Sequence, residues 1–238
     1  DPALRWRLLP AALCHLAGLR GHAVFLFPWI GLVLLLAQIS GTLADRSGDR
    51  VLALFGACLV GTTSGVWTVT TWLGINDAWY LSALIAVVYT RSPVVLVLAG
   101  FGGPWVDERF LLGLPLAVLL RYSFPPGAGR KVGIVAPMAG AALYLGIRVL
   151  VSVAFRDATS HDFVRSALRD CSTWLPWAPL GWFFGFRAAW CVVLAAVVAT
   201  FLTVPRSLAI AIAGASIGSL LALTVLAADL TRATPLLL

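Results

Sequence analysis

The sequence predicts an all-α, polytopic membrane protein with about seven transmembrane helices (six to eight), including short, kinked or re-entrant helices and one interfacial helix. Hydrophobic residues make up 61% of its 238 residues and charged residues only 11%, whereas soluble domains are about one quarter charged. Runs of about 20 apolar residues recur, without the alternation of a transmembrane β-barrel. We expect residues 1–238 to form one integral membrane domain. Because the chain begins at Asp1, a fragment lacking its N-terminus is an alternative to a complete protein.

Seven apolar runs account for the predicted spans, after a short amphipathic or interfacial lead-in over residues 1–22. These runs are residues 24–40, 51–74, 80–103, 110–120, 132–154, 177–204 and 207–228. The third contains Arg91-Ser92-Pro93, which favours two short helices over one kinked helix. Proline ends or kinks a helix at its preceding residue, and a charge at mid-bilayer is costly. The run 110–120 is too short for a regular span.

Hydroxyl side chains are frequent in the second run, and glycine pairs occur in the last two. We expect the threonines of residues 51–74 to hydrogen-bond to carbonyls of their own helix, which requires no functional role. The spacings Gly181/Gly185 and Gly214/Gly218 match the GxxxG pattern. This pattern predicts close packing against a partner helix.

The longest polar interruption between the runs is residues 155–174, which we expect to form the interfacial helix. Helical spacing places an apolar set and a charged set on different faces. The sets are Phe163, Ala167 and Cys171, and Asp162, Arg165 and Arg169. One interpretation is a helix lying in the headgroup layer with solvated charges. The other is an anion clamp, because Arg165 and Arg169 repel each other unless a carboxylate or phosphate lies between them.

The net charge of +7 indicates membrane topology rather than nucleic-acid binding, because the arginines are scattered at the ends of apolar runs. We expect membrane lipid as a partner and no nucleic acid. The four cysteines form no CxxC pair, and the sequence indicates no cofactor, metal site or disulfide framework. We assign the side that carries Arg5, Arg7 and Arg20 to the cytoplasm of a bacterial cytoplasmic membrane. The N-terminus is then cytoplasmic, with Asp77 on the same side, and the other acids from Asp45 to Asp229 face outward.

Asp107 and Glu108 are adjacent carboxylates at a predicted membrane edge, where one of them could act as a general base. The alternative is an acidic pair that ends a helix and pairs with Arg109. Arg148 and Arg187 lie inside apolar runs and are functional candidates by position. Alternatively, they reach the headgroups or pair with an acid from another helix. His161 and Asp162 are candidates for a proton-transfer pair.

The segment from Asn76 to Leu116 carries a resemblance to a known family. It opens on Asn76-Asp77, turns at Arg91-Ser92-Pro93, and reaches Asp107-Glu108-Arg109 through the small residues 100–103. It resembles the membrane core of polytopic GT-C-type glycosyltransferases, in which an acidic turn precedes short helices joined at an Arg-Pro corner. A small-residue segment, an acidic turn and a Leu/Pro-rich helix follow there.

The resemblance implies transfer of a sugar from a polyprenyl-phosphate donor, a lipid-linked sugar phosphate, at the outer membrane face. A carboxylate would be the base and arginines would hold the phosphate. The candidate bases are Asp107, Glu108, Asp45 and Asp49. The last two would stand for the family's acid in the first extracytoplasmic loop. The candidate phosphate ligands are Arg165, Arg169, Arg148 and Arg187. The alternative function is a non-catalytic membrane subunit or small transporter, whose intramembrane arginines pair with partners or an anion.

Overall fold

A computed structural model describes residues 7–64, 66, 69, 75–123, 130–154, 171–172 and 175–226. No β-strand occurs in these ranges, which confirms the predicted all-α class. The elements, in chain order, are α1 (Leu8–Leu16), η2 (Gly21–Phe25), α2 (Leu26–Ser47), α3 (Arg50–Gly61), α5 (Asp77–Tyr89), α6 (Pro93–Val106), α7 (Arg109–Ser123), α8 (Arg130–Ala154), η3 (Leu175–Trp177), α10 (Ala178–Phe186), η4 (Arg187–Ala189), α11 (Trp190–Thr203) and α12 (Arg206–Leu226).

Three helical segments of the described chain are long and apolar enough to cross a membrane: Gly21–Ser47, Lys131–Ala154 and Leu175–Thr203. This supports a membrane protein by length and composition, with fewer full-length spans than the seven expected. The other apolar helices are shorter, and specific side chains account for where several of them end.

The first predicted span is longer than expected, and the polar loop expected over residues 41–50 is mostly helical. α2 continues to residue 47 and ends at Gly48, whose φ of 69° is the left-handed conformation that glycine adopts readily. Asp49 then caps α3, because its carboxylate accepts hydrogen bonds from the N–H groups of Val51 (2.8 Å) and Leu52 (3.2 Å). The polar composition indicated a loop, although these residues form the exposed last turns of a helix.

The predicted second span over residues 51–74 is interrupted, so its prediction as one uniform helix is wrong. α3 ends at Gly61. The hydroxyl of Thr62 donates to the carbonyl oxygen of Leu59 (2.7 Å), and the hydroxyl of Thr63 donates to the carbonyl oxygen of Val60 (2.8 Å). For Thr62 and Thr63 the predicted bonding back to helix carbonyls is therefore present. It coincides with the end of the helix, as expected when side chains compete for backbone carbonyls.

The Arg91-Ser92-Pro93 corner separates two helices, which confirms the preference for two short helices over one kinked helix. α5 ends before Thr90, which has an extended backbone, and α6 begins at Pro93. The Ser92 hydroxyl accepts a hydrogen bond from the Val95 N–H (3.4 Å). The next run, expected over 110–120, is the slightly longer α7.

α8 and α12 agree closely with the predicted runs 132–154 and 207–228, as far as the described residues extend. The run 177–204 is divided by η4 into α10 and α11. Arg187 lies at this junction with a φ of 49°, a left-handed conformation uncommon for a residue with a side chain. Most of the predicted interfacial helix over residues 155–174 lies outside the described residues. Cys171 and Ser172 are helical.

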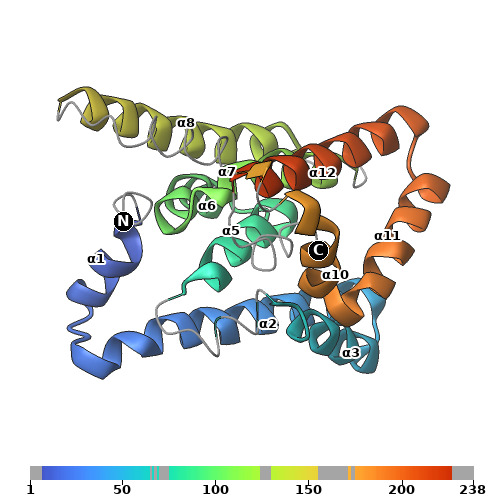
Figure 1. Cartoon of the computed structure of the whole chain (residues 1–238), viewed down its shortest axis with the longest axis horizontal. Helices are drawn as coiled ribbons and strands as arrows, with labels where there is room; N and C mark the ends of the chain where they lie inside the picture. The colour runs from blue at the N-terminus through green and yellow to red at the C-terminus, as the bar shows by residue number, and fades with distance from the viewer. Residues whose placement is uncertain are drawn as a thin grey trace.

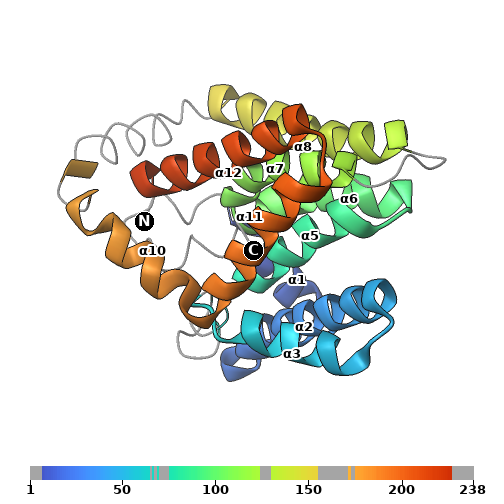
Figure 2. The ribbon, with the colours of Figure 1, turned by 90° about the vertical axis from the view of Figure 1, so that its right-hand side faces the viewer.

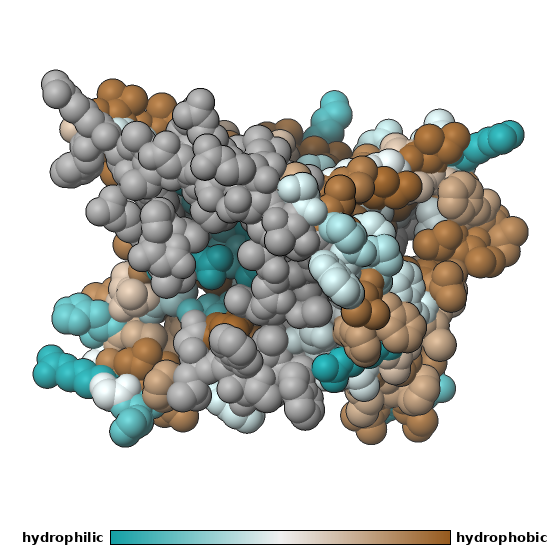
Figure 3. Space-filling view, in the orientation of Figure 1, coloured by the Kyte–Doolittle hydropathy of each residue, from teal (hydrophilic) through white to brown (hydrophobic). Residues whose placement is uncertain are grey.

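α2 and α8 lie on opposite sides of the molecule, with α5, α6 and α7 between them (Figure 1). α12 packs against α7, so that α10–α12 form a second group beside α1–α8 (Figure 2). Apolar side chains remain exposed over much of α11 and α12, including Leu194, Leu202 and Ile210. Figure 3 shows brown, hydrophobic surface on the right of the molecule. Such a surface suits contact with lipid.

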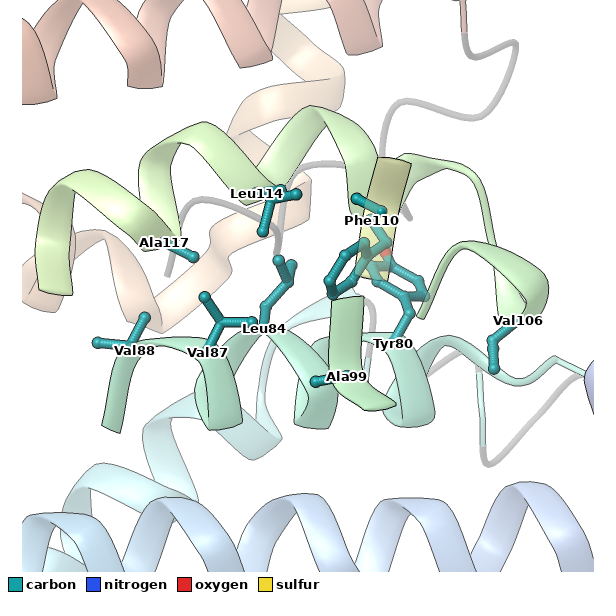
Figure 4. Packing of buried hydrophobic residues seen from close by; sticks show 10 residues of the cluster. Tyr80, Leu84, Val87, Val88, Ala99, Val106, Phe110, Leu114 and Ala117 are labelled. Carbon is teal, nitrogen blue, oxygen red and sulfur yellow. The ribbon is translucent and has the colours of Figure 1, made fainter. Parts of the chain in front are cut away.

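The main core lies between α5 and α7, with α6 and α8 packed against them. Tyr80, Leu84 and Val87 of α5 face Phe110 and Leu114 of α7 (Figure 4). α6 and α8 approach each other closely, because a Cβ on Gly100 would lie 2.1 Å from the carbonyl oxygen of Pro137. α5, α6 and α7 run alternately up and down, so their ends form two polar layers.

We name these layers the acidic end, which contains Asp77, Asp107 and Glu108, and the arginine end, which contains Arg46, Arg91 and Arg121. Arg121 marks the arginine end, since its guanidinium donates to the carbonyl oxygens of Val87 (2.8 Å) and Thr90 (2.7 Å) where α5 finishes.

Candidate active site

An inner cluster of two carboxylates and two arginines occupies the acidic end. The Asp107 carboxylate lies 2.9 Å from the Arg7 guanidinium and 2.8 Å from that of Arg109. Arg109 also contacts the Asp77 carboxylate at 2.7 Å. Only 4% of the Asp107 side chain and 3% of the Asp77 side chain are exposed. The cluster therefore joins the segment before α1 to the starts of α5 and α7.

The local sequence explains how Asp107 reaches this position. It follows α6 in an extended conformation, with φ of −157°, and turns the chain into α7. One carboxylate oxygen accepts the backbone N–H of Arg109 (3.0 Å) and its Nε–H (2.9 Å), so the same residue caps α7 and binds its first side chain. The Tyr80 ring lies 5.2 Å from the Arg109 guanidinium carbon, at cation–π distance.

The charges of the inner cluster stabilise one another. Burial opposes ionisation of Asp107, but the nearby Arg109 and Arg7 outweigh it and hold the pKa of this carboxyl below its usual range. Burial likewise disfavours charge on Arg109, but the carboxylates of Asp77 (2.7 Å) and Asp107 (2.8 Å) compensate its guanidinium. Asp107 is therefore a weak base that stays ionised. Its predicted pairing with Arg109 is confirmed. A role as general base conflicts with its ion pairs to two arginines.

An outer cluster lies on the other side of the α6–α7 turn. Glu108 forms an ion pair with Arg148 of α8, and its carboxylate accepts the hydroxyl hydrogen of Tyr144 (3.1 Å). Arg148 donates in turn to the Tyr144 oxygen (3.0 Å). The Glu108 side chain is 40% exposed and that of Arg148 is 17% exposed. A base must reach its substrate, so Glu108 is the more suitable of the two adjacent carboxylates.

Trp105 borders the outer cluster. Its ring meets the Tyr144 ring edge to face, with centroids 4.9 Å apart. The buried Nε1–H of Trp105 has no hydrogen-bond partner within the described ranges. Buried N–H groups nearly always have a hydrogen-bond partner. This unpaired donor, beside a carboxylate–arginine pair, is therefore available to donate to a bound ligand.

A cavity of about 270 Å³ adjoins the inner cluster. Asp77, Asp107 and Arg7 line it, and its other walls are mainly apolar side chains of α1 and the start of α2. Cavities with apolar walls and a few convergent polar groups are the usual form of small-molecule sites.

The structure brings together three of the predicted site residues: Asp107, Glu108 and Arg148. Asp45 and Asp49 lie elsewhere, near the C-terminal end of α2. The first turn of α2 is at the acidic end, where Trp79 donates to the Phe27 carbonyl (3.0 Å). Asp45 is 18 residues farther along this helix, or about 27 Å at 1.5 Å per residue. Neither aspartate can act in one site with Glu108.

The other predicted phosphate ligands do not join this site. Arg187 is exposed at the α10–α11 junction, which packs near α3. Arg165, Arg169, His161 and Asp162 lie outside the described residues. The expected placement of Arg7 and Asp107 on opposite membrane faces is wrong, because their side chains are in contact.

Sequence reasoning missed Asp77, Arg7 and Tyr144 as members of these clusters. Asp77 stands 32 residues before its partner Arg109, and Tyr144 stands 36 residues after Glu108. The available signal was the helical spacing of Tyr144 and Arg148, which places both on one face of α8.

The chain matches no protein-family model, no curated protein and no solved structure, so its function is inferred from the geometry of these clusters and the sequence.

Proposed function

We propose that this chain is a membrane-embedded glycosyltransferase-like protein that transfers a sugar from a polyprenyl-phosphate donor. The observation that carries the proposal is the outer cluster, in which an accessible carboxylate, Glu108, is held by an arginine, Arg148, and a tyrosine, Tyr144. Such a reaction needs a base for the acceptor and a cation for the departing phosphate.

In this mechanism the donor phosphate replaces Glu108 as the partner of Arg148. The released Glu108 carboxylate takes the proton of an acceptor hydroxyl, whose oxygen attacks the anomeric carbon of the sugar. The bond from that carbon to the phosphate oxygen breaks, and polyprenyl phosphate leaves with the bonding electrons. Arg148 stabilises the charge on the leaving group. Asp107, held by Arg7 and Arg109, fixes the turn that presents Glu108.

The proposal treats the shorter helices as crossings beside the three long ones, within the expected range of six to eight. It places the arginine end in the cytoplasm of a bacterial membrane. The basic side chains there include Arg46, Arg91, Arg121 and Lys131, whereas Arg7, Arg109 and Arg148 at the acidic end are paired with acids. Basic residues favour the cytoplasmic side. The N-terminal Arg7 then faces outward, the reverse of the orientation expected from sequence.

A non-catalytic subunit or small transporter is the second candidate. The ion pairs of Asp107 with Arg7 and Arg109 favour this second candidate, because a buried ion-pair network joins helices without leaving a reactive group. The two candidates differ in what Glu108 does.

The test is a sugar-transfer assay in proteoliposomes, with a panel of polyprenyl-phosphate-linked sugars and acceptors bearing hydroxyl groups. We expect Glu108→Gln to lower transfer about 100-fold or more without changing the melting temperature greatly. The matched control is Asp45→Asn, a carboxylate-to-amide change about 27 Å away along α2, which should retain wild-type transfer. Equal transfer by both variants, or no transfer by the wild type with any donor, would favour the non-catalytic subunit.

A further inference from the structure

A second cavity lies at the arginine end, where it is independent of the clusters proposed for transfer. It has a volume of about 790 Å³ and opens between the last turns of α2 and the α5–α6 corner. Its lining includes Gln38, Thr42, Asp45, Arg46, Tyr89 and Arg91. Along α5 it is 12 residues from Asp77, or about 18 Å.

We propose that this cavity binds a phosphate ester at the membrane surface, with Arg46 and Arg91 holding the phosphate. Within the part of the chain that the structure describes, Arg91 makes no hydrogen bond or ion pair. The guanidinium carbon of Arg46 lies 5.2 Å from the centroid of the Tyr89 ring, which holds this side chain at the cavity. Guanidinium groups bind phosphate by paired, charge-assisted hydrogen bonds.

The backbone around the corner favours an anion as well. The C-terminal end of α5 would repel one through its unpaired carbonyl groups. Arg121 removes this obstacle, because its guanidinium occupies the carbonyls of Val87 and Thr90. α6 begins two residues after Arg91, and the start of a helix carries partial positive charge.

The remaining lining residues indicate what carries the phosphate. The lining contains one carboxylate, Asp45, and two arginines, so its net charge is positive. Gln38, Thr42 and Thr90 offer amide and hydroxyl groups, which suit a substituent bearing hydroxyls, such as glycerol. The volume exceeds that of a bare phosphate ion. Exposed apolar side chains adjoin the corner, including Val94, which is 66% exposed. These features fit a phospholipid headgroup of the phosphatidylglycerol type or a soluble glycerol phosphate.

The test measures lipid binding to the full chain, purified in detergent, by native mass spectrometry. We expect phosphatidylglycerol to bind the wild type more tightly than phosphatidylcholine. The double substitution Arg46→Gln/Arg91→Gln should weaken phosphatidylglycerol binding by about thirtyfold, since each arginine near an anionic lipid contributes roughly fivefold. The matched control is Arg20→Gln/Arg206→Gln, which removes two exposed arginines outside the cavity lining.

Competition with glycerol phosphate distinguishes the two sources of the ligand. Displacement of the lipid by millimolar glycerol phosphate identifies a soluble phosphate ester, and lack of displacement identifies a lipid headgroup. Arg91→Lys should retain part of the affinity, because the charge remains while paired hydrogen bonding is lost. Equal weakening in the cavity and control double variants would overturn the proposal. So would the absence of any preference for phosphatidylglycerol or glycerol phosphate over phosphatidylcholine in the wild type. Glu108→Gln should leave this binding unchanged.

Discussion

Asp107 and Glu108 are neighbours in the chain, yet the structure gives them opposite surroundings. The Asp107 side chain is 4% exposed and lies between two arginines, whereas that of Glu108 is 40% exposed and has one arginine and one tyrosine. The inner cluster joins α5, α7 and the segment before α1, and the outer cluster joins the turn to α8. The difference shows that sequence adjacency does not give two carboxylates the same role. One is suited to holding the fold together and the other to meeting a ligand.

The largest expected effect is on stability, when the arginine that pairs with both inner carboxylates is replaced. Arg109→Gln leaves Asp77 and Asp107 without their common partner in the core. We expect it to lower the free energy of unfolding by about 3–5 kcal/mol, measured by chemical unfolding in detergent. Arg148→Gln is the matched outer variant, and it should cost less than about 1 kcal/mol because water can reach Glu108. Equal losses would contradict the distinction between the clusters.

A glycine substitution that displaces α8 should affect the outer cluster, because α8 carries Arg148. A Cβ on Gly140 would lie 2.3 Å from the backbone oxygen of Val97, so Gly140→Ala forces α8 away from α6. We expect a loss of about 1–3 kcal/mol and impaired sugar transfer, since α8 carries Arg148. Gly146→Ala, on the same helix, meets nothing within 4 Å. It should be neutral or stabilising by up to about 1 kcal/mol, and a loss as large as that of Gly140→Ala would contradict the packing argument.

Acid should act on the inner cluster through Asp107. The folded protein holds the pKa of this carboxyl below its unfolded value, which is about 3.9. The stability from its ionised form is therefore present above that value and is lost as the pH falls toward and through the lower folded pKa. We expect Asp107→Asn to reduce the dependence of the melting temperature on pH below about pH 4. A wild-type dependence in Asp107→Asn would contradict this assignment.

The smallest expected effect is that of Glu108→Gln on stability. The amide keeps the size of the side chain and can still accept the Tyr144 hydroxyl. Because Glu108 is well exposed, we expect a change within about 1 kcal/mol in chemical unfolding. A much larger loss would assign Glu108 to the structural framework and weaken its proposed part in transfer.

The sequence predicted local features of this fold well. The proline corner before α6, the apolar run of α8 and the pairing of Asp107 with Arg109 all depend on residues close together in the chain. Arg148 was expected to pair with an acid from another element as one alternative, and Glu108 is that acid. The inner partners Asp77 and Arg7 were not predicted, because both lie far from Asp107 and Arg109 in the chain and no periodic pattern relates such distant residues.

Two kinds of helix boundary also escaped prediction. The exposed polar turns of α2 resemble a loop in composition, so residues 41–47 were assigned wrongly. The end of α3 depends on two threonine hydroxyls that bond to carbonyls within the preceding turn, a choice that hydropathy does not reveal. The predicted residues between 155 and 170 lie outside the described part, and their proposed clamp stays a prediction.

The lengths of the central helices have a consequence for the surrounding bilayer. α5, α6 and α7 contain 13, 14 and 15 residues, which rise about 20–22 Å, whereas the hydrocarbon layer is about 30 Å thick. α2 and α8, with 22 and 25 residues, rise about 33–37 Å. α2 meets the centre at both of its ends, through Phe27 at the acidic end and Arg46 at the arginine end, so the long helices surround a centre that is shorter than the hydrocarbon layer. Lipid beside such a centre thins or tilts, so a phosphate at either end can approach its arginine by a short lateral movement.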